Sequence, residues 1–312
     1  MKSYIEIDLK KIEENTIELT NKIGKEKIIA VLKADAYGLG YKEVFKKLLS
    51  LGIKYYAVGT LEEAFELYDI NKSVRILILC PFENVDYEKI KNTNIEITVT
   101  NEDSLKYLLK NNIKNNIHIK FDTGMNRLGF KKENIHLIDK YVDKLNIVGI
   151  FTHLSSVTTN EEYTLKQIDI FNEYTKKCSL KKHILNSDGV SKYYKDKNKV
   201  LDYVRVGIYL FKNSISFYTK VCNVYEFNEK YYAVLNVGYL DGYAKKFSNN
   251  ARVYIKNNYY NVTDIDMYYT VILADKNVNI GDKVELFGKH IEINEEYMTG
   301  FSDKLEKIYK GI

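Results

Sequence analysis

Lys33 stands at the end of an apolar run, KIIAVLKADAYGLG, that covers residues 27 to 40. The run has the length of a buried parallel strand, and Gly38 and Gly40 predict that its C-terminal end opens into a loop. Burial disfavours the charged ammonium group, so a partly desolvated lysine at this point can supply a neutral amine for a Schiff base. The same pattern also fits a lysine that is simply the first solvated residue after a strand.

Other groups with catalytic chemistry follow later apolar runs. Arg127 ends the stretch HIKFDTGMNR, and a guanidinium can bind an oxyanion with two parallel hydrogen bonds. His153 follows an apolar run in IFTHLSS, where a structural histidine would fit as well. Asn186 and Ser187 precede a short helical pattern, which predicts either an ordinary N-cap or an anion site. Arg205 lies inside the apolar stretch DYVRVGIYLF, and this position requires a partner for its charge.

Repeated strand and helix patterns would position these groups. Short apolar runs recur at residues 27–33, 55–59, 75–79, 95–99, 117–121, 147–152, 182–186 and 203–210, and helical patterns such as LEEAFELYDI separate most of them. Eight strands that alternate with helices predict an α/β fold, a parallel (β/α)8 TIM barrel whose catalytic groups gather at the C-terminal ends of the strands. An open doubly wound sheet is the alternative architecture.

The pattern changes after Phe211 to short segments rich in Tyr, Val and Ile, separated by Asn, Gly and Lys. This composition predicts a second, C-terminal all-β domain. We therefore expect a barrel in residues 10–212 and a β domain in residues 213–312. Residues 1–9 should form a strand that packs with the β domain. Residues 10 to 23 have apolar side chains at helical spacing, with Gly24 as the C-cap.

Composition excludes several classes of function. The 312 residues carry a net charge of +5 without a basic block, so a nucleic-acid surface is not indicated. No apolar run is long enough to cross a membrane, and Met1 leads into a strand pattern rather than a signal segment, so we expect a cytoplasmic protein. Cys80, Cys178 and Cys222 are too scattered for a zinc site or a disulfide framework, and no metal is expected.

Five ordered motifs resemble those of the alanine racemases, pyridoxal-phosphate enzymes of fold type III. The motifs are VLKADAYGLG, KFDTGMNRLG, FTH, VRVGI and VGYLDGY, and they extend over both expected domains. The resemblance implies that the barrel binds pyridoxal 5'-phosphate covalently on Lys33. It also implies that His153 stacks under the pyridine ring and that Arg205 donates to the ring nitrogen. The phosphate would then contact Tyr37, Ser187, Gly207 and Ile208.

The resemblance further implies that the protein racemises a small amino acid, most simply L-alanine to D-alanine. D-alanine is a peptidoglycan precursor. Lys33 and Tyr239 would be the two catalytic bases, with Tyr239 supplied by the second subunit of a homodimer. Arg127 and Met267 would contact the substrate, and Lys120, carbamylated in many relatives, would support Arg127. Racemisation of serine or another amino acid is an alternative within the family.

Rival interpretations remain open at this point. A non-catalytic pyridoxal-phosphate-binding homologue would keep the lysine motif. Single-barrel pyridoxal-phosphate homeostasis proteins lack a β domain and a segment like that of Tyr239. Decarboxylases of the same fold type normally carry a glutamate where Arg205 stands.

The chain departs from the family pattern at several points. Asp35 replaces the usual asparagine, and Leu39 replaces the usual histidine in the lysine motif. Tyr268 stands where the family has an acid that helps to form the substrate carboxylate site, and Asp303 falls where a tyrosine often contacts phosphate. The stretch between Gly207 and Tyr239 is also shorter than is usual. We expect these changes to alter the size or polarity of the substrate pocket.

Overall fold

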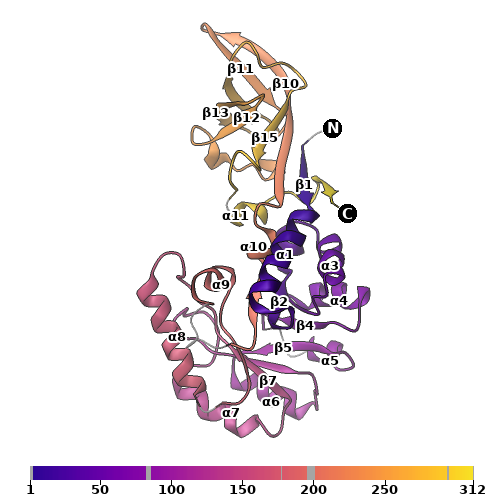
Figure 1. Cartoon of the computed structure of the whole chain (residues 1–312), viewed down its shortest axis with the longest axis vertical. Coiled ribbons are helices and arrows are strands. Elements are labelled where there is room, and N and C mark those ends of the chain that lie inside the picture. Colours follow the sequence, from indigo (N-terminus) through magenta and orange to yellow (C-terminus); the bar gives the residue numbers. More distant parts are fainter. Residues whose placement is uncertain (1–2, 82–85, 177, 195–200, 294, 312) are drawn as a thin grey trace. The chain divides into compact units, whose positions relative to one another are not determined.

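The computed structural model describes residues 3–81, 86–176, 178–194, 201–293 and 295–311. The chain divides into two compact units, shown in Figure 1. The barrel unit comprises Thr16–Ala34 and Leu48–Leu210. The β unit comprises Met1–Asn15, Asp35–Lys47 and Phe211–Ile312.

Eight parallel strands form the sheet of the barrel unit, in the spatial order β8-β7-β6-β5-β4-β3-β2-β9. A parallel bridge between His183, at the end of β8, and Tyr203, just before β9, closes this sheet on itself. The eight predicted runs and the TIM barrel are therefore confirmed, and the open doubly wound sheet is excluded. The strands are β2 (Ile28–Val31), β3 (Tyr55–Val58), β4 (Arg75–Ile78), β5 (Ile95–Val99), β6 (Ile117–Lys120), β7 (Ile147–Phe151), β8 (Lys181–His183) and β9 (Val204–Val206).

The barrel strands are buried on both faces because side chains fill the interior and helices cover the outside. Strands β2, β3, β5 and β6 contain only buried residues. Polar residues are buried among them, including Glu96, His118, Lys120, His183 and Arg205. The barrel interior therefore combines an aliphatic core with a set of charged and polar groups.

Helices alternate with the barrel strands and begin at residues that suit helix starts. Thr60 and Glu63 form a capping box at the start of α4, and Asn101 caps α6. Gly24 ends α1 with φ +85°, as its C-cap position predicts. The helices are α1 (Leu9–Ile23), α2 (Lys33–Tyr37), α3 (Tyr41–Ser50), α4 (Leu61–Ile70), α5 (Tyr87–Ile90), α6 (Glu102–Lys110), α7 (Ile135–Tyr141), α8 (Glu161–Thr175), α9 (Ser187–Tyr193), α10 (Ile208–Phe211) and α11 (Glu295–Met298).

The β unit contains a second eight-stranded sheet, in the order β11-β14-β13-β12-β15-β10-β1-β16. Strand β1 pairs antiparallel with β10 and parallel with β16, so the N-terminal strand lies in this sheet. Its strands are β1 (Tyr4–Asp8), β10 (Ile215–Phe227), β11 (Lys230–Leu235), β12 (Arg252–Ile255), β13 (Asn258–Ile265), β14 (Thr270–Ala274), β15 (Lys283–Phe287) and β16 (Glu306–Lys310). The predicted C-terminal all-β domain is confirmed.

Within the described ranges, no helix is long and apolar enough to cross a membrane. The same ranges contain no cluster of three or more His, Cys, Asp or Glu side chains arranged to hold a metal ion.

Candidate active site

The backbone turns left-handed directly after Lys33. Ala34, Asp35, Ala36 and Tyr37 have φ between +53° and +59°, so α2 is a left-handed helical turn. This conformation costs about 1–2 kcal/mol per residue in L-amino acids. It therefore persists only where surrounding contacts enforce it, and such strain gathers at functional sites.

Contacts within each unit hold this turn. In the barrel unit, the carboxylate of Glu63 accepts hydrogen bonds from the backbone N–H groups of Ala34 and Gly59. In the β unit, Asp35 accepts from the N–H of Tyr41 and from Nζ of Lys307. The glutamate of the α4 capping box thus also fixes the backbone next to Lys33.

Glycines make room for the same segment. Gly40 has φ +92°, and a Cβ there would overlap with the hydroxyl of Tyr309. Gly38 has φ +84°, and its Cβ would lie 2.5 Å from the carbonyl oxygen of Met298. Both positions therefore favour glycine for steric as well as conformational reasons.

The side chain of Lys33 is exposed in the single chain. The expectation that the strand end itself desolvates this lysine is therefore wrong. Lys33 begins α2 and lies beyond strand β2, which ends at Val31.

The positive charges of four residues act on His153 in the barrel unit. Burial, followed by the charges of Arg205, Arg127, Lys120 and Lys33 in that order, lowers the pKa of His153 to about 3. His153 is therefore neutral at physiological pH. The predicted barrel residues Lys33, Lys120, Arg127, His153 and Arg205 thus lie within electrostatic reach of one another, in a field suited to an anion.

Lys120 ends strand β6, and Arg127 lies on the loop that follows. Burial lowers the pKa of Lys120 to about 8, assisted by the positive charges of Arg127 and Arg205. Asp122 shapes the loop, because its carboxylate accepts hydrogen bonds of 3.0 Å from the N–H groups of Gly124 and Asn126. Within the described part of the chain, Lys120 forms no ion pair with a carboxylate. The loop therefore presents one exposed guanidinium beside a buried amine that loses its proton easily.

Arg205 is buried on strand β9, and burial lowers its pKa to about 10. Its Nη1 donates to Nδ1 and to the carbonyl oxygen of His183, both at 2.8 Å, and Nη2 donates to the carbonyl oxygen of Thr152 at 2.7 Å. The partners that the sequence predicts for the charge of Arg205 are therefore neutral acceptors rather than a carboxylate. These bonds use three of the five N–H donors of the guanidinium, which leaves two for a ligand atom.

Ser187 meets the start of α10. Its hydroxyl oxygen accepts hydrogen bonds from the N–H groups of Gly207 at 3.3 Å and Tyr209 at 3.1 Å. Asn186 caps α9 through the N–H of Gly189, as the N-cap interpretation predicts. Backbone N–H groups that converge beside a hydroxyl are the donor set of a phosphate site. Tyr209 was not singled out in the sequence, whereas its neighbour Ile208 was.

The β unit carries the remaining predicted residues. Tyr239 is 43% exposed and Met267 is 42% exposed. The two segments are joined by hydrogen bonds from the N–H of Tyr239 to the carbonyl oxygen of Asp266 and from the N–H of Leu240 to that of Met267. Gly238 permits this approach, because a Cβ there would overlap with the carbonyl oxygens of Asp266 and Met267. Tyr37 is also in this unit, where its ring centroid lies 5.7 Å from that of Phe211.

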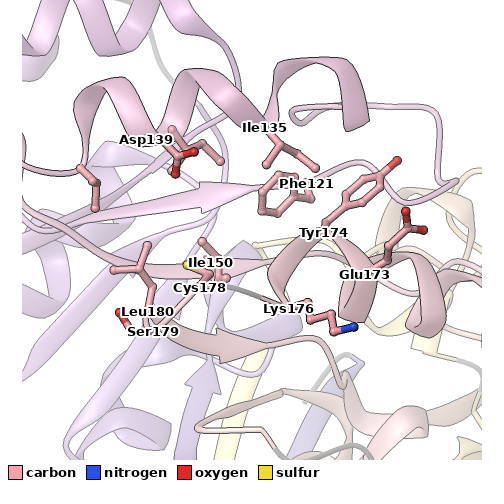
Figure 2. A pocket seen from close by; sticks show the side chains of 12 residues that line it. Phe121, Ile135, Asp139, Ile150, Glu173, Tyr174, Lys176, Cys178, Ser179 and Leu180 are labelled. Carbon is pink, nitrogen blue, oxygen red and sulfur yellow. The ribbon is translucent and has the colours of Figure 1, made fainter.

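A cavity of about 440 Å³ lies elsewhere in the barrel unit, between α7, α8 and strand β7 (Figure 2). Its walls include Phe121, Ile135, Ile150 and Tyr174. None of the residues with predicted catalytic or binding roles lines it. It is therefore not the site indicated by the sequence.

Comparisons with known proteins match the whole chain. The family model "Alanine racemase, N-terminal domain" matches residues 7–214, and "Alanine racemase, C-terminal domain" matches residues 217–309. The alanine racemase of Fusobacterium nucleatum is 32% identical, with 99% of each chain covered. The chain belongs to the alanine racemase family.

Solved structures share the fold of this chain. The biosynthetic alanine racemase of Pseudomonas aeruginosa superimposes with a TM-score of 0.92 at 20% identity, with 99% of each chain covered. The alanine racemase of Bartonella henselae, solved with covalently bound pyridoxal phosphate, gives a TM-score of 0.90 at 24% identity over 99% of each chain. At these identities the superpositions support the fold alone. The resemblance inferred from the five motifs is confirmed.

The barrel unit fits the cofactor of this family. The four cations around His153 suit the negative charges of a pyridoxal phosphate, and the amides of Gly207 and Tyr209 with the hydroxyl of Ser187 suit its phosphate. The two remaining donors of Arg205 suit a neutral ring nitrogen. The residues present are therefore compatible with the group.

A buried network that the sequence does not predict lies behind Arg205 and runs through His183 and His118 to Glu96. Its only sequence signal is a polar residue within each of the apolar runs IEITV, IHIK and KHIL. Such residues are buried in a parallel barrel and need partners, but their partners come from other strands and cannot be identified from one run.

Proposed function

We propose that this chain catalyses the pyridoxal-phosphate-dependent racemisation of a small amino acid, with alanine as its best substrate. The observation that carries the proposal is the convergence of Lys33, Lys120, Arg127 and Arg205 on neutral His153, in a chain related over its whole length to alanine racemases. Such cations would bind the phosphate and carboxylate groups of cofactor and substrate. They also stabilise negative charge that develops during the reaction.

Several residues would hold the cofactor. Lys33 would bind it covalently through Nζ, and His153 would stack against its ring. Its phosphate would be bound by Ser187, Tyr37 and the N–H groups at residues 207 to 209. Arg205 would donate to the ring nitrogen and, because its pKa is still about 10, would keep its proton. When bound, pyridoxal phosphate supplies the electron sink that stabilises negative charge on the α-carbon of the substrate.

Racemisation requires proton transfer on two opposite faces of the α-carbon. Nζ of Lys33 would exchange the α-proton of the D-enantiomer, and the hydroxyl of Tyr239 would exchange that of the L-enantiomer. A phenol is a weak base at neutral pH, so Tyr239 needs positive neighbours that favour its ionised form. The cations near His153 would provide that field.

Arg127 and Met267 would contact the substrate carboxylate side. Lys120 would support Arg127, in carbamylated form, because a carbamate would replace a repelling positive charge with an attracting negative one. Tyr268 stands at the position of the family's usual acid, which changes the polarity of this side of the pocket. We therefore propose serine as the second-best substrate, since the hydroxyl of Tyr268 can form a hydrogen bond with the hydroxyl of serine.

A homodimer would complete the site. Tyr239, Leu240, Met267, Tyr268 and Tyr269 are each between 42% and 46% exposed in the single chain, and together they offer an apolar and aromatic surface that a second subunit could cover. Covering by a partner would also shield exposed Lys33 from water. Supply of D-alanine for peptidoglycan in the cytoplasm belongs to the same proposal.

A deuterium-exchange assay tests the function. The chain is incubated in D2O with pyridoxal phosphate and each amino acid, and enantiomers and α-deuterium are measured. We expect exchange to be fastest with alanine, with serine slower by no more than about 10²-fold, which is the limit of discrimination for one added hydroxyl in an apolar pocket. Preference for a large or basic amino acid, or the absence of any exchange, would refute the proposal.

Tyr239→Phe provides the matching variant. It removes the acid and base group but keeps the ring, so exchange that starts from the L-enantiomer should fall by about 10²–10⁴, more than exchange from the D-enantiomer. Tyr231→Phe is the control, because Tyr231 is a 41% exposed tyrosine on strand β11. Unchanged exchange from both enantiomers in Tyr239→Phe would remove Tyr239 from the mechanism.

A further inference from the structure

A chain of buried hydrogen bonds leads from Arg205 across the barrel interior. Nη1 of Arg205 lies 2.8 Å from Nδ1 of His183, and Nε2 of His183 lies 2.8 Å from Nδ1 of His118. Nε2 of His118 lies 2.9 Å from Oε2 of Glu96. Both histidines are fully buried, and Glu96 is 1% exposed. Four side chains from strands β9, β8, β6 and β5 are therefore connected without access to solvent.

The groups at the two ends of this hydrogen-bond chain decide which atom donates and which accepts in each bond. A guanidinium can only donate, so Nδ1 of His183 must accept and its proton must be on Nε2. That proton is donated to Nδ1 of His118, which places the proton of His118 on Nε2 as well. A carboxylate can only accept, so the last bond runs from His118 to Glu96. Every bond is satisfied only when both histidines are neutral Nε2–H tautomers.

The pKa shifts of the hydrogen-bonded groups agree with neutral Nε2–H tautomers of His118 and His183. Burial lowers the pKa of His118 and of His183, which keeps both rings neutral. Burial acts to raise the pKa of Glu96, but the hydrogen bonds from His118 and Arg75 bring it down to about 2. Arg75 donates to Glu96 through Nε at 2.7 Å and Nη2 at 3.1 Å, and Tyr55 donates at 2.6 Å. Glu96 is therefore a fixed anion.

The packing leaves the two rings little freedom. His183 stacks on Phe151 with ring centroids 4.8 Å apart and an interplanar angle of 9°, and the guanidinium of Arg205 lies 4.9 Å from the same Phe151 ring. Gly149 faces His118, and any Cβ at that position would overlap with Nδ1 of the ring. Sterics thus hold the rings in place, and hydrogen bonding decides where their protons lie.

We propose that Glu96 is a positioning residue for Arg205. Its negative charge anchors the hydrogen-bond chain, keeps Nδ1 of His183 as an acceptor, and so orients the guanidinium that faces the site. Glu96 acts through His118 and His183 and touches neither cofactor nor substrate. The inference rests on the proposed role of Arg205 at the cofactor for its effect on the reaction, but the proton positions themselves do not depend on that role.

Glu96→Gln shows why the charge matters. If the amide oxygen of the glutamine faces His118, its NH2 group meets the donor Nε of Arg75. If the NH2 group faces His118, both histidines must reverse their tautomers, and a protonated Nδ1 of His183 then meets the donor Nη1 of Arg205. Arg75 is 39% exposed at its side chain and can turn toward water, but Arg205 is buried and cannot. The first arrangement places two donors in contact at Arg75, whereas the reversed one does so at both Arg75 and Arg205 and displaces Arg205.

The proton positions can be measured directly by 15N NMR of the histidine rings. The full chain, with and without added pyridoxal phosphate, is labelled at histidine, and His118 and His183 are assigned with His118→Gln and His183→Gln variants. We expect both rings to be neutral Nε2–H tautomers that do not titrate between about pH 6 and 8, near the usual histidine pKa. A proton on Nδ1 of either ring in the wild-type chain would overturn the proposal, even if Glu96→Gln fails to fold.

Glu96→Gln then tests whether the negative charge of Glu96 fixes the proton positions of His118 and His183. We expect Nε2–H to be lost or mixed with Nδ1–H at His183, a shifted visible absorption band of the bound cofactor, and a fall in kcat of about 10- to 100-fold, the range for residues that orient a functional group from behind. Glu285→Gln is the matched control, because Glu285 is a buried glutamate 2.9 Å from Nδ1 of His290 in the β unit. Unchanged His183 tautomers together with an unchanged absorption band and an unchanged kcat in folded Glu96→Gln would overturn the proposal. Altered tautomers in a chain that shows no racemisation would instead count against the proposed function alone.

Discussion

Asp35 and Lys307 form an ion pair that joins the left-handed turn after Lys33 to strand β16. The other carboxylate oxygen of Asp35 accepts the N–H of Tyr41 at 2.8 Å. Asparagine, the residue expected at this position from the family motif, could keep the second contact but not the first. A charge therefore contributes to holding a backbone conformation that L-residues avoid.

Asp35→Asn should lower the melting temperature slightly. The side chains of Lys307 and Asp35 are 19% and 38% exposed, so the ion pair is partly screened and contributes about 0.5–1 kcal/mol. The difference between variant and wild type should vanish at high salt. Thermal melts at two salt concentrations measure it. Lys310→Ala, which breaks the ion pair with Glu6 in the same sheet, is the control for a general charge effect. Identical melting curves for Asp35→Asn and wild type at low salt would contradict the prediction.

His153 should make stability depend on pH. Because burial and the nearby cations lower its pKa from about 6.5 to about 3, the unfolded chain binds one more proton than the folded chain between these values. The free energy of unfolding should therefore fall as the pH decreases from about 6.5 to 3, by at most about 1.4 kcal/mol per pH unit from this residue, and be unaffected by it above that window.

Denaturation curves of the cofactor-free chain across this range test the sign. In His153→Gln, the free energy of unfolding should decrease less steeply than in wild type as the pH falls from about 6.5 to 3. His136→Gln should leave it unchanged, because His136 is exposed on α7. Equal acid limbs in wild type and His153→Gln would show that this histidine is not buried in its neutral form.

Much of the fold could be predicted from the chain alone, because its determinants are local. The eight apolar runs matched strands β2 to β9 within a few residues, since apolar character over four or five residues is enough to mark a buried parallel strand. Gly24 marked the end of α1 because only its own backbone conformation mattered. The strand ends then located the candidate site residues of the barrel unit.

The remaining features depend on partners distant in sequence. The left-handed turn at residues 34–37 contains no glycine, so its conformation could be recognised only from the contacts of Glu63, Asp35 and Lys307 that enforce it. Glu96 and His118 are polar residues in apolar strands, and their sequence context gives no reason to connect them with Arg205. The proton direction along that chain needed all three distances.

Lys120 should react with carbon dioxide near neutral pH. Only the neutral amine forms a carbamate, and burial with the nearby arginines brings the pKa of Lys120 to about 8, so an appreciable neutral fraction exists at pH 7.5 to 8.5. Incubation with 13C-bicarbonate should give a carbamate signal in 13C NMR. Lys120→Arg should remove it, and Lys132→Arg should not, because the ion pair with Glu173 raises the pKa of exposed Lys132. A signal that persists in Lys120→Arg would assign the reactive amine to another lysine.

Subunit mixing tests whether the site is shared between two chains. If Tyr239 of one subunit serves the cofactor on Lys33 of the other, Lys33→Ala and Tyr239→Phe chains should each be nearly inactive alone. In the mixed dimer, one site then has both wild-type bases and the other has neither, so mixing should restore activity up to about one quarter of the wild-type level when subunits exchange at random in equal amounts. Native mass spectrometry verifies that subunits have exchanged. The control is a mixture of Lys33→Ala with Lys33→Ala/Tyr239→Phe, because no combination of those chains contains a wild-type Lys33. Failure to recover activity after verified exchange would mean that Lys33 and Tyr239 act within one chain, and the exposed surface around Tyr239 and Met267 would then need another explanation.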